Sequence, residues 1–331
     1  MNTFTYTRAA DAAEAVREVS ASGTTRPIAG GTNIIDLMKE NVARPARLVD
    51  ITGLPFAEIE ERPDGGLRLG ALVTNATTAY HPLVQERYPL VSKAILAGAS
   101  PQLRNMATNG GNLLQRTRCY YFYDTGTPCN KRTPGSGCGA LHGFNRNHAI
   151  LGTSEHCIAT HPSDFCIALA ALEAVVQVRG PKGERAIPFS DFHRLPGDTP
   201  EIDTHLAQDE IITAIDLPPR GFARHSTYLK LRDRESYAFA LVSAAAALEL
   251  DGDTIAEARF ALGGVAHKPW RVPEAEAVLR GAPAAREHFE HAAEVTLRGA
   301  RGFGYNSFKI ELARRAIVRA LGIAAGQEDE L

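Results

Sequence analysis

Four of the five cysteines lie in or beside one stretch of the chain. Cys119, Cys129, Cys138 and Cys157 have nine, eight and eighteen residues between them, and no C-x-x-C pair occurs. That spacing counts against a zinc ribbon and against a thioredoxin-like site. Widely spaced thiolates on a glycine-rich loop can still converge on one iron–sulfur cluster. Spacing alone slightly favours the alternative, exposed or disulfide-bonded thiols on a flexible loop.

The fifth cysteine, Cys166, stands inside the apolar run Phe165–Leu169. We expect it to be a buried small hydrophobic residue and not a ligand, because free cysteine is among the most buried residue types. An odd number of cysteines also fits poorly with a pure disulfide framework. His161 and His267 are predicted to be structural and not metal ligands.

Two glycine-pair turns could bind an anion. Residues 30–33 (Gly-Gly-Thr-Asn) separate a predicted strand, 26–29, from a predicted helix, 34–40, and residues 108–112 (Thr-Asn-Gly-Gly-Asn) form a second turn. Glycines allow close approach of the backbone, and successive N–H groups favour phosphate. Two such turns could clamp the pyrophosphate of a dinucleotide. Neither is a G-x-G-x-x-G or Walker A motif, so two unrelated tight turns are the alternative.

Asp164 and Lys230 are two further polar candidates. Asp164 follows Ser163 at the start of a predicted apolar helix, 163–174, where either residue could simply cap the helix. Asp164 could instead accept hydrogen bonds from a ribose hydroxyl or a ring N–H. Lys230 alternates with apolar residues in a predicted strand, 227–232, which is typical of a solvated strand face.

The segment 115–148, which carries three of the cysteines, shows neither helical nor strand periodicity. Such a long insert is uncommon in a compact domain and is usually functional or disordered. Its glycines, its cysteines and the aromatic run Tyr120–Tyr123 argue against a plain linker.

The remaining patterns predict an α+β protein of three units. Residues 1–55 read as a small α/β unit, residues 56–220 as a larger mixed unit with the insert, and residues 221–331 as a C-terminal α+β unit. The boundary is placed at the turn Pro218–Gly221. Three strands and then three helices are predicted for the C-terminal unit, at 227–232, 240–250, 255–262, 274–280, 284–297 and 308–321.

Composition limits the possible partners. The 331 residues carry 36 Lys+Arg and 38 Asp+Glu, a net charge of −2 that argues against nucleic-acid or membrane-surface binding. The longest apolar run, Phe165–Val178, is too short to span a bilayer and contains Glu173. Residues 1–15 lack the apolar stretch of a signal peptide, so none is expected.

Taken together, the motifs resemble the FAD-binding (medium) subunit of the xanthine dehydrogenase family, the molybdenum hydroxylases. The resemblance spans essentially the whole chain, in order, through residues 28–33, 107–112, 161–164 and 262–266. The insert, through residues 115–119 and 128–132, is most similar to the FAD subunit of bacterial molybdenum-dependent aldehyde oxidoreductases. Subunits of that branch hold an additional [4Fe-4S] cluster.

The resemblance implies a fold and a set of contacts. The fold is a vanillyl-alcohol-oxidase-type (PCMH-type) FAD-binding domain of two subdomains, followed by a C-terminal domain of the CO dehydrogenase flavoprotein type. No residue of this chain is expected to be catalytic. The expected FAD contacts are Pro27, Ile28, Ala29, Gly30, Gly31, Thr32, Asn33 and Ile34 around the pyrophosphate, Thr108, Gly111 and Asn112 opposite, and Asp164, Ile212 and Lys230. The expected cluster ligands are Cys119, Cys129, Cys138 and Cys157.

The implied function is electron relay. A molybdenum-cofactor large subunit would oxidise an aldehyde to a carboxylic acid, and a small subunit with two [2Fe-2S] clusters would pass electrons to FAD and on to an external acceptor. A heterotrimer or its dimer is expected, assembled in the cytoplasm or co-exported to the periplasm on a partner's signal. The alternatives are a stand-alone FAD oxidoreductase of the same fold and a zinc- or nucleic-acid-binding module.

Overall fold

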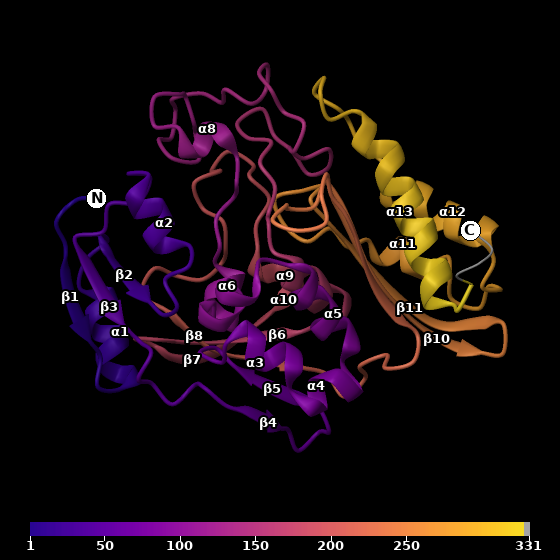
Figure 1. The fold of residues 1–331 in the computed structure, drawn as a ribbon, viewed down its shortest axis with the longest axis horizontal. Coiled ribbons are helices and arrows are strands. Elements are labelled where there is room, and N and C mark those ends of the chain that lie inside the picture. Colours follow the sequence, from indigo (N-terminus) through magenta and orange to yellow (C-terminus); the bar gives the residue numbers. More distant parts are fainter. Residues whose placement is uncertain (328–331) are drawn as a thin grey trace.

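The computed structural model describes residues 1–327 and contains three sheets along the chain, each with helices against it (Figure 1). Each of the three units proposed from the sequence holds one sheet. In chain order the elements are β1 (Thr5–Arg8), α1 (Ala12–Ser20), β2 (Thr25–Ile28), α2 (Ile34–Lys39), β3 (Arg47–Asp50), β4 (Ile59–Glu61), β5 (Leu67–Gly70), α3 (Asn75–Tyr80), α4 (Pro82–Arg87), α5 (Pro89–Ala97), α6 (Pro101–Met106), α7 (Asn109–Leu113), α8 (Tyr120–Tyr123), α9 (Asp164–Ala171), β6 (Val175–Gly180), β7 (Gly183–Pro188), α10 (Phe189–Phe192), β8 (Ile211–Leu217), β9 (Ser226–Leu231), β10 (Val242–Asp251), β11 (Thr254–Gly263), α11 (Pro273–Ala277), α12 (Arg286–Thr296) and α13 (Phe308–Ala324).

The N-terminal sheet is parallel, with β3 between β1 and β2. Helix α1 begins at Asp11, whose carboxylate accepts a 2.8 Å hydrogen bond from the amide of Glu14. Its apolar stripe, which includes Ala15 and Val19, packs with Val49 of β3. Because β2 pairs with β3 along its whole length, the first glycine turn leaves the sheet at a defined point.

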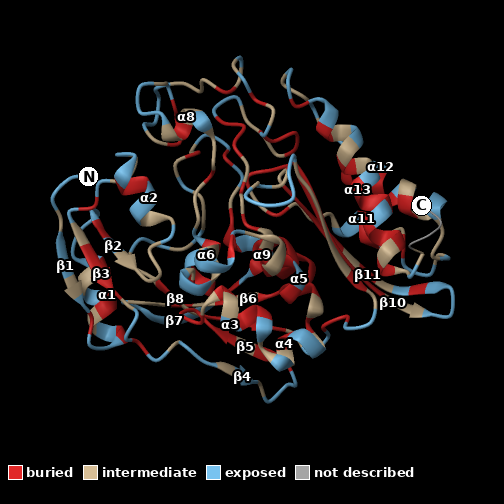
Figure 2. Ribbon diagram, viewed as in Figure 1, coloured by how far each residue is buried: buried red, intermediate tan, exposed pale blue. Residues whose placement is uncertain are grey.

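The central sheet has five strands in the order β4-β5-β8-β6-β7, and every neighbouring pair is antiparallel. Helix α9 packs in its core and is buried from Phe165 to Ala171 (Figure 2). A helix that is apolar on all sides is stable only when other elements surround it. Here α5 and the C-terminal sheet lie against it.

The C-terminal sheet is three-stranded and antiparallel, with β10 between β9 and β11, as predicted. Strand β10 contains four successive alanines. Ala244 and Ala246 belong to the core beneath the C-terminal helices, whereas Ala245 and Ala247 belong to the central core. Side chains of a strand alternate between its two faces, so this one sheet forms a wall shared by both cores.

The insert, residues 115–148, contains one short helix, α8, and otherwise consists of turns and irregular chain with one isolated bridge (Figure 1). Polar side chains fix it by donating to backbone carbonyls. Lys131 Nζ donates to Pro200 O at 2.6 Å, Arg132 donates to Tyr121 O at 2.7 Å, and Asn145 Nδ2 donates to the carbonyl of Phe303 at 2.7 Å. Long-range polar contacts therefore order a segment that has no periodic pattern of its own.

Across residues 1–327, none of the helices combines the length and the apolar character that crossing a bilayer requires.

Candidate functional site

The two predicted glycine turns lie against each other. Residues 29–33 join β2 to α2, and residues 107–112 run from α6 into α7. A Cβ on Gly30 would lie 1.7 Å from the carbonyl oxygen of Met106, so no larger residue fits there. Gly31 has a φ of 72°, in the region that favours glycine. The pair of glycines is needed for close approach at one position and for backbone conformation at the other.

A groove of about 430 Å³ follows the first turn and reaches the second. The backbone amides of residues 30–33 donate to no acceptor within the described chain, and Asn33 Nδ2 is buried without a partner there. Arg26 and Arg116 also line the groove. Free N–H donors and positive charge together suit a pyrophosphate. Of the predicted contacts, the groove is lined by Pro27, Ile28, Ala29, Gly30, Gly31, Thr32, Asn33, Ile34, Thr108 and Gly111.

Thr108 and Asn112 shape the second turn through internal hydrogen bonds. Thr108 is the N-cap of α7, and its hydroxyl accepts from the amide of Gly111 at 3.3 Å. The side chain of Asn112 donates to Asn75 Oδ1 at 2.6 Å and accepts from Ser163 Oγ at 2.5 Å. Asn112 therefore ties the turn to α3 and to the start of α9.

A second cavity, of about 220 Å³, adjoins the groove and shares Thr32, Asn33 and Gly111 with it. Its walls are mainly apolar and come from α5, α6, α9 and the loop 237–239, while Asp164 and Lys230 bring charge. Apolar walls with a few directed polar groups are typical of sites for flat cofactor rings.

Asp164 and Lys230 form a buried ion pair at this cavity. Lys230 Nζ lies 2.7 Å from Asp164 Oδ2, and the two side chains are 5% and 9% exposed, respectively. Tyr228 donates to Asp164 Oδ1 at 2.6 Å, and burial, followed by the Asp164 charge, raises the Tyr228 pKa well above its usual value. The solvated strand face that alternation predicts for Lys230 is therefore wrong. Ser163 is the helix cap, accepting from the Cys166 amide at 3.0 Å, so Asp164 is free for the pair.

Ile212 stands apart from the other predicted contacts. It is buried on β8, and its Cβ would lie 3.5 Å from a Cβ placed on Gly110, beneath the second glycine turn. The side chain supports that turn from below, and its contact with a flavin stays a prediction.

The two cavities together fit FAD. The groove offers the amide and guanidinium donors that a pyrophosphate needs, and the adjoining cavity offers an apolar slot beside Asp164 and Lys230. Asn33, whose Nδ2 is buried without a partner in the described chain, lines both cavities. Because the cavities share residues, one extended ligand can occupy both.

The four cysteines of the predicted cluster converge. All four thiols line one cavity, although eighteen residues separate Cys157 from Cys138, the nearest of the others in sequence. Cys129 and Cys138 face each other in an isolated antiparallel bridge. All five cysteines of the described chain are free. The cavity measures about 10 Å³, so the four thiols that line it lie close to one another.

Burial and mutual contact set the ionisation of these thiols. Burial raises the pKa of Cys119 to about 12. Cys157 and Cys138 share a hydrogen bond, which lowers the pKa of the Cys138 thiol to about 6 and raises that of Cys157. Such shared-proton thiols lose their remaining protons when a metal coordinates them. The four cysteine sulfurs are therefore suitable ligands for a metal group that binds thiolates.

Cys166 lies away from these thiols, on α9, and is fully buried as predicted. Its sulfur and one ring nitrogen each of His161 and His193 lie within 4.8 Å of one another. His193 Nε2 is 2.9 Å from the Leu113 carbonyl oxygen. Burial holds the pKa of both histidines below the usual value, to about 4 for His193, so both rings are neutral near pH 7.

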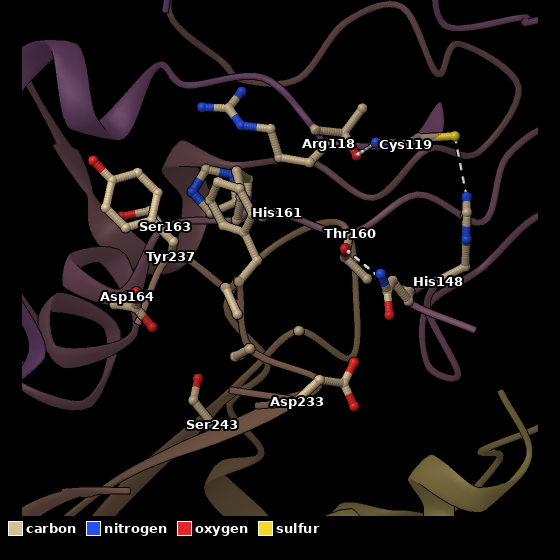
Figure 3. Close-up of a pocket in the computed structure, with 18 of the residues that line it drawn as sticks. Arg118, Cys119, His148, Thr160, His161, Ser163, Asp164, Asp233, Tyr237 and Ser243 are labelled. Carbon is tan, nitrogen blue, oxygen red and sulfur yellow. Dashed lines mark hydrogen bonds between the residues drawn. The ribbon is translucent and has the colours of Figure 1, made fainter. Parts of the chain in front are cut away.

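Sequence reasoning missed a third cavity, of about 400 Å³, that connects the two centres. Cys119 and His148 lie on one side of it, and Asp164 and Tyr237 lie on the other (Figure 3). Arg118, whose guanidinium carbon is 5.2 Å from the Phe239 ring centre, lines both this cavity and the one beside Lys230. The loop 232–240 has no sequence pattern that marks it, so only its position identifies it.

The comparisons with known proteins agree with this geometry. Residues 2–220 match the family described as FAD binding domain in molybdopterin dehydrogenase, and residues 226–323 match the CO dehydrogenase flavoprotein C-terminal domain. The chain therefore belongs to the FAD-binding subunits of the molybdenum hydroxylase family, which are oxidoreductases. This confirms the predicted family, fold and FAD cofactor.

The chain is also similar, along nearly its whole length, to individual proteins of this family. The chain is 50% identical over 329 residues to the aldehyde oxidoreductase FAD-binding subunit PaoB of Escherichia coli (strain K12), covering 99% of this chain and 100% of PaoB. It is 27% identical to the nicotine 6-hydroxylase medium subunit of Paenarthrobacter nicotinovorans, covering 95% and 96% of the two chains. A structure of carbon monoxide dehydrogenase from Hydrogenophaga pseudoflava has a TM-score of 0.77 at 24% identity, covering 98% of each chain, and shares the fold.

The contact between the two turns predicts that Gly30→Ala weakens flavin binding. The added methyl group would push Met106 away and open the groove, and we expect FAD affinity to fall about tenfold or more, as a cost of 1.4 kcal/mol or above implies. Flavin absorbance per purified chain measures this. Gly53→Ala is the matched control, since a Cβ there meets nothing within 4 Å. Full flavin content in Gly30→Ala would contradict the proposed groove.

The buried neutral histidines predict a loss of stability in mild acid. Burial lowers the pKa of His193 from 6.5 to about 4. The unfolded chain therefore binds a proton below pH 6.5 that the folded chain refuses until about pH 4. Stability present above pH 6.5 is lost as the pH falls across this window, by about 3 kcal/mol for this one group.

Urea denaturation at pH 7 and at pH 4.5 tests this linkage. We expect His193→Gln to lose less stability between the two pH values than the unaltered chain. The control His142→Gln, at an exposed position, should behave like the unaltered chain. Equal acid sensitivity of His193→Gln and the unaltered chain would refute the assignment.

Proposed function

We propose that this chain is the FAD- and [4Fe-4S]-containing electron-transfer subunit of a heteromeric molybdenum aldehyde oxidoreductase. A large subunit with a molybdenum cofactor would convert an aldehyde and water into a carboxylic acid, two electrons and two protons. A small subunit with two [2Fe-2S] clusters would supply the electrons to this chain, and an external acceptor would remove them. The full-length similarity to an aldehyde oxidoreductase FAD-binding subunit supports this assignment.

One observation in particular supports electron transfer between the proposed cluster and FAD. Cys119 lines both the four-thiol cavity and the third cavity, and Asp164 lines both the third cavity and the proposed flavin cavity, so one cavity connects the two proposed cofactor sites. Electron transfer between cofactors requires proximity, and the protein's contribution is to place and tune them. A flavin oxidase with no other redox centre has no need of four converging thiols.

The residues of this chain would hold the two cofactors, orient them and tune their chemistry. The amides of residues 30–33 would bind the pyrophosphate, and the Asp164–Lys230 pair would present a fixed charge arrangement to the ring system. Bound FAD supplies the ability to exchange electrons singly or in pairs. Cys119, Cys129, Cys138 and Cys157 would ligate the cluster. No side chain here is assigned an acid, base or nucleophile role, because substrate oxidation would occur on a partner.

The visible spectrum, together with iron, sulfide and zinc analysis of the purified chain, separates the candidate functions. Flavin bands with about four irons per chain are expected. Flavin without iron would favour the stand-alone FAD oxidoreductase and refute the cluster. A colourless, zinc-containing protein would favour the zinc module instead.

Mass spectrometry of the native complex tests the partners and the compartment. We expect co-purification with a large and a small subunit from the cytoplasmic fraction. Recovery of all three from the periplasm would favour export on a partner's signal. Isolation of this chain alone, with full aldehyde-oxidising activity, would contradict the subunit assignment.

The ligand set predicts different outcomes for two cysteines. Cys129→Ser should remove the cluster's electron paramagnetic resonance signal while flavin absorbance stays, because Cys129 lies in the insert and outside both flavin cavities. Cys166→Ser is the matched control and should keep the signal. Loss of the signal in Cys166→Ser, or its persistence at full intensity in Cys129→Ser, would overturn the ligand assignment.

A further inference from the structure

The ring of His148 contacts one of the four thiols. His148 Nε2 lies 3.1 Å from Cys119 Sγ, and the histidine is 2% exposed (Figure 3). By contrast, Cys138 and Cys157 contact each other and backbone amides. The imidazole contact therefore distinguishes Cys119 from these two thiols.

The C-terminal unit holds His148 in this position. Its carbonyl oxygen accepts from Lys309 Nζ at 2.8 Å and from Asn306 Nδ2 at 3.3 Å, and its own amide donates to Asn145 O at 3.0 Å. Lys309 is fully buried and also donates to Gly264 O at 2.5 Å. The backbone of His148 is thus fixed from both sides, which limits where its ring can lie.

The direction of the hydrogen bond depends on whether Cys119 is a thiol or a thiolate. A protonated thiol can donate to a ring nitrogen, but a metal-bound thiolate carries no proton and can only accept. His148 Nδ1 is buried without a partner in the described chain. A neutral ring protonated at Nε2 satisfies the thiolate and leaves the unpartnered Nδ1 as the lone-pair nitrogen.

We infer that His148 is a positioning residue that raises the reduction potential of the proposed cluster by donating a hydrogen bond from Nε2 to the Cys119 thiolate. This inference rests on the proposed function, since it requires the cluster. Hydrogen bonds to cluster sulfurs stabilise the reduced state, which carries one more negative charge. His148 borders the cavity that reaches Asp164, so its effect acts on the side of the cluster that faces the flavin cavity.

Redox titration of the complete complex, followed by electron paramagnetic resonance, tests the inference. His148→Phe removes the donor and should shift the cluster's midpoint potential to a more negative value. His148→Gln keeps an N–H near the position of Nε2. Its midpoint potential should therefore lie close to that of the unaltered complex. His156→Phe is the matched control, because His156 lines the same thiol cavity from an exposed position without bonding to a sulfur.

A second measurement uses the unaltered complex and does not depend on any variant folding. Selective ¹⁵N labelling of histidine rings should produce a nitrogen coupling on the reduced cluster in pulsed electron paramagnetic resonance. The coupling should persist in His156→Phe and disappear in His148→Gln, whose side chain is unlabelled.

The outcomes separate this inference from the proposed function. Absence of a cluster signal in the unaltered complex would refute the proposed function itself. A normal cluster with no histidine coupling, or with an unchanged potential in His148→Phe, would overturn the role of His148 alone. A negative shift in His148→Phe that His148→Gln reverses would support it.

Discussion

The buried ion pair between Asp164 and Lys230 is the interaction on which the candidate site depends. Removing two charges from water is costly unless each finds further partners. The other oxygen of the Asp164 carboxylate accepts a hydrogen bond from Tyr228, and the Ala97 carbonyl accepts one from Lys230 at 3.1 Å. Asp164 begins α9 and Lys230 lies on β9, so the pair joins the central and C-terminal units. The apolar cavity beside it exists only when the C-terminal sheet is docked.

The same docking organises the cysteine insert. Strand β10 offers alternate alanines to two cores, which lets the C-terminal sheet lie close to α9. Asn306, just before α13, and Lys309, in its first turn, then donate to the carbonyl of His148. An insert without periodic structure is therefore ordered by contacts from the domain that follows it, and Cys119 comes to line both the thiol cavity and the third cavity.

Regular elements with apolar periodicity were predictable from the sequence. The strand predicted at 26–29 and the helix predicted at 34–40 agree with β2 and α2, and the predicted C-terminal strands and helices lie within a few residues of β9–β11 and α11–α13. Strands β1 and β7 were not predictable, because both are edge strands of mostly exposed residues and so lack an apolar alternation. Nor were helices α4 and α6, which are short and begin at prolines that read as turns.

By itself, the sequence determined the residue types available for chemistry: two glycine turns, four thiols apart from a fifth in an apolar helix, and an acid at a helix start. Local patterns carry this information because turn geometry and burial depend on neighbouring residues. Only the tertiary structure decided that Gly30 meets Met106, that Lys230 pairs with Asp164, and that Lys309 binds the carbonyl of His148. These contacts join residues 66 positions apart for the ion pair and 161 apart for Lys309 and His148. Local periodicity holds no information about such pairs, since they form only when separate units bury their surfaces against one another.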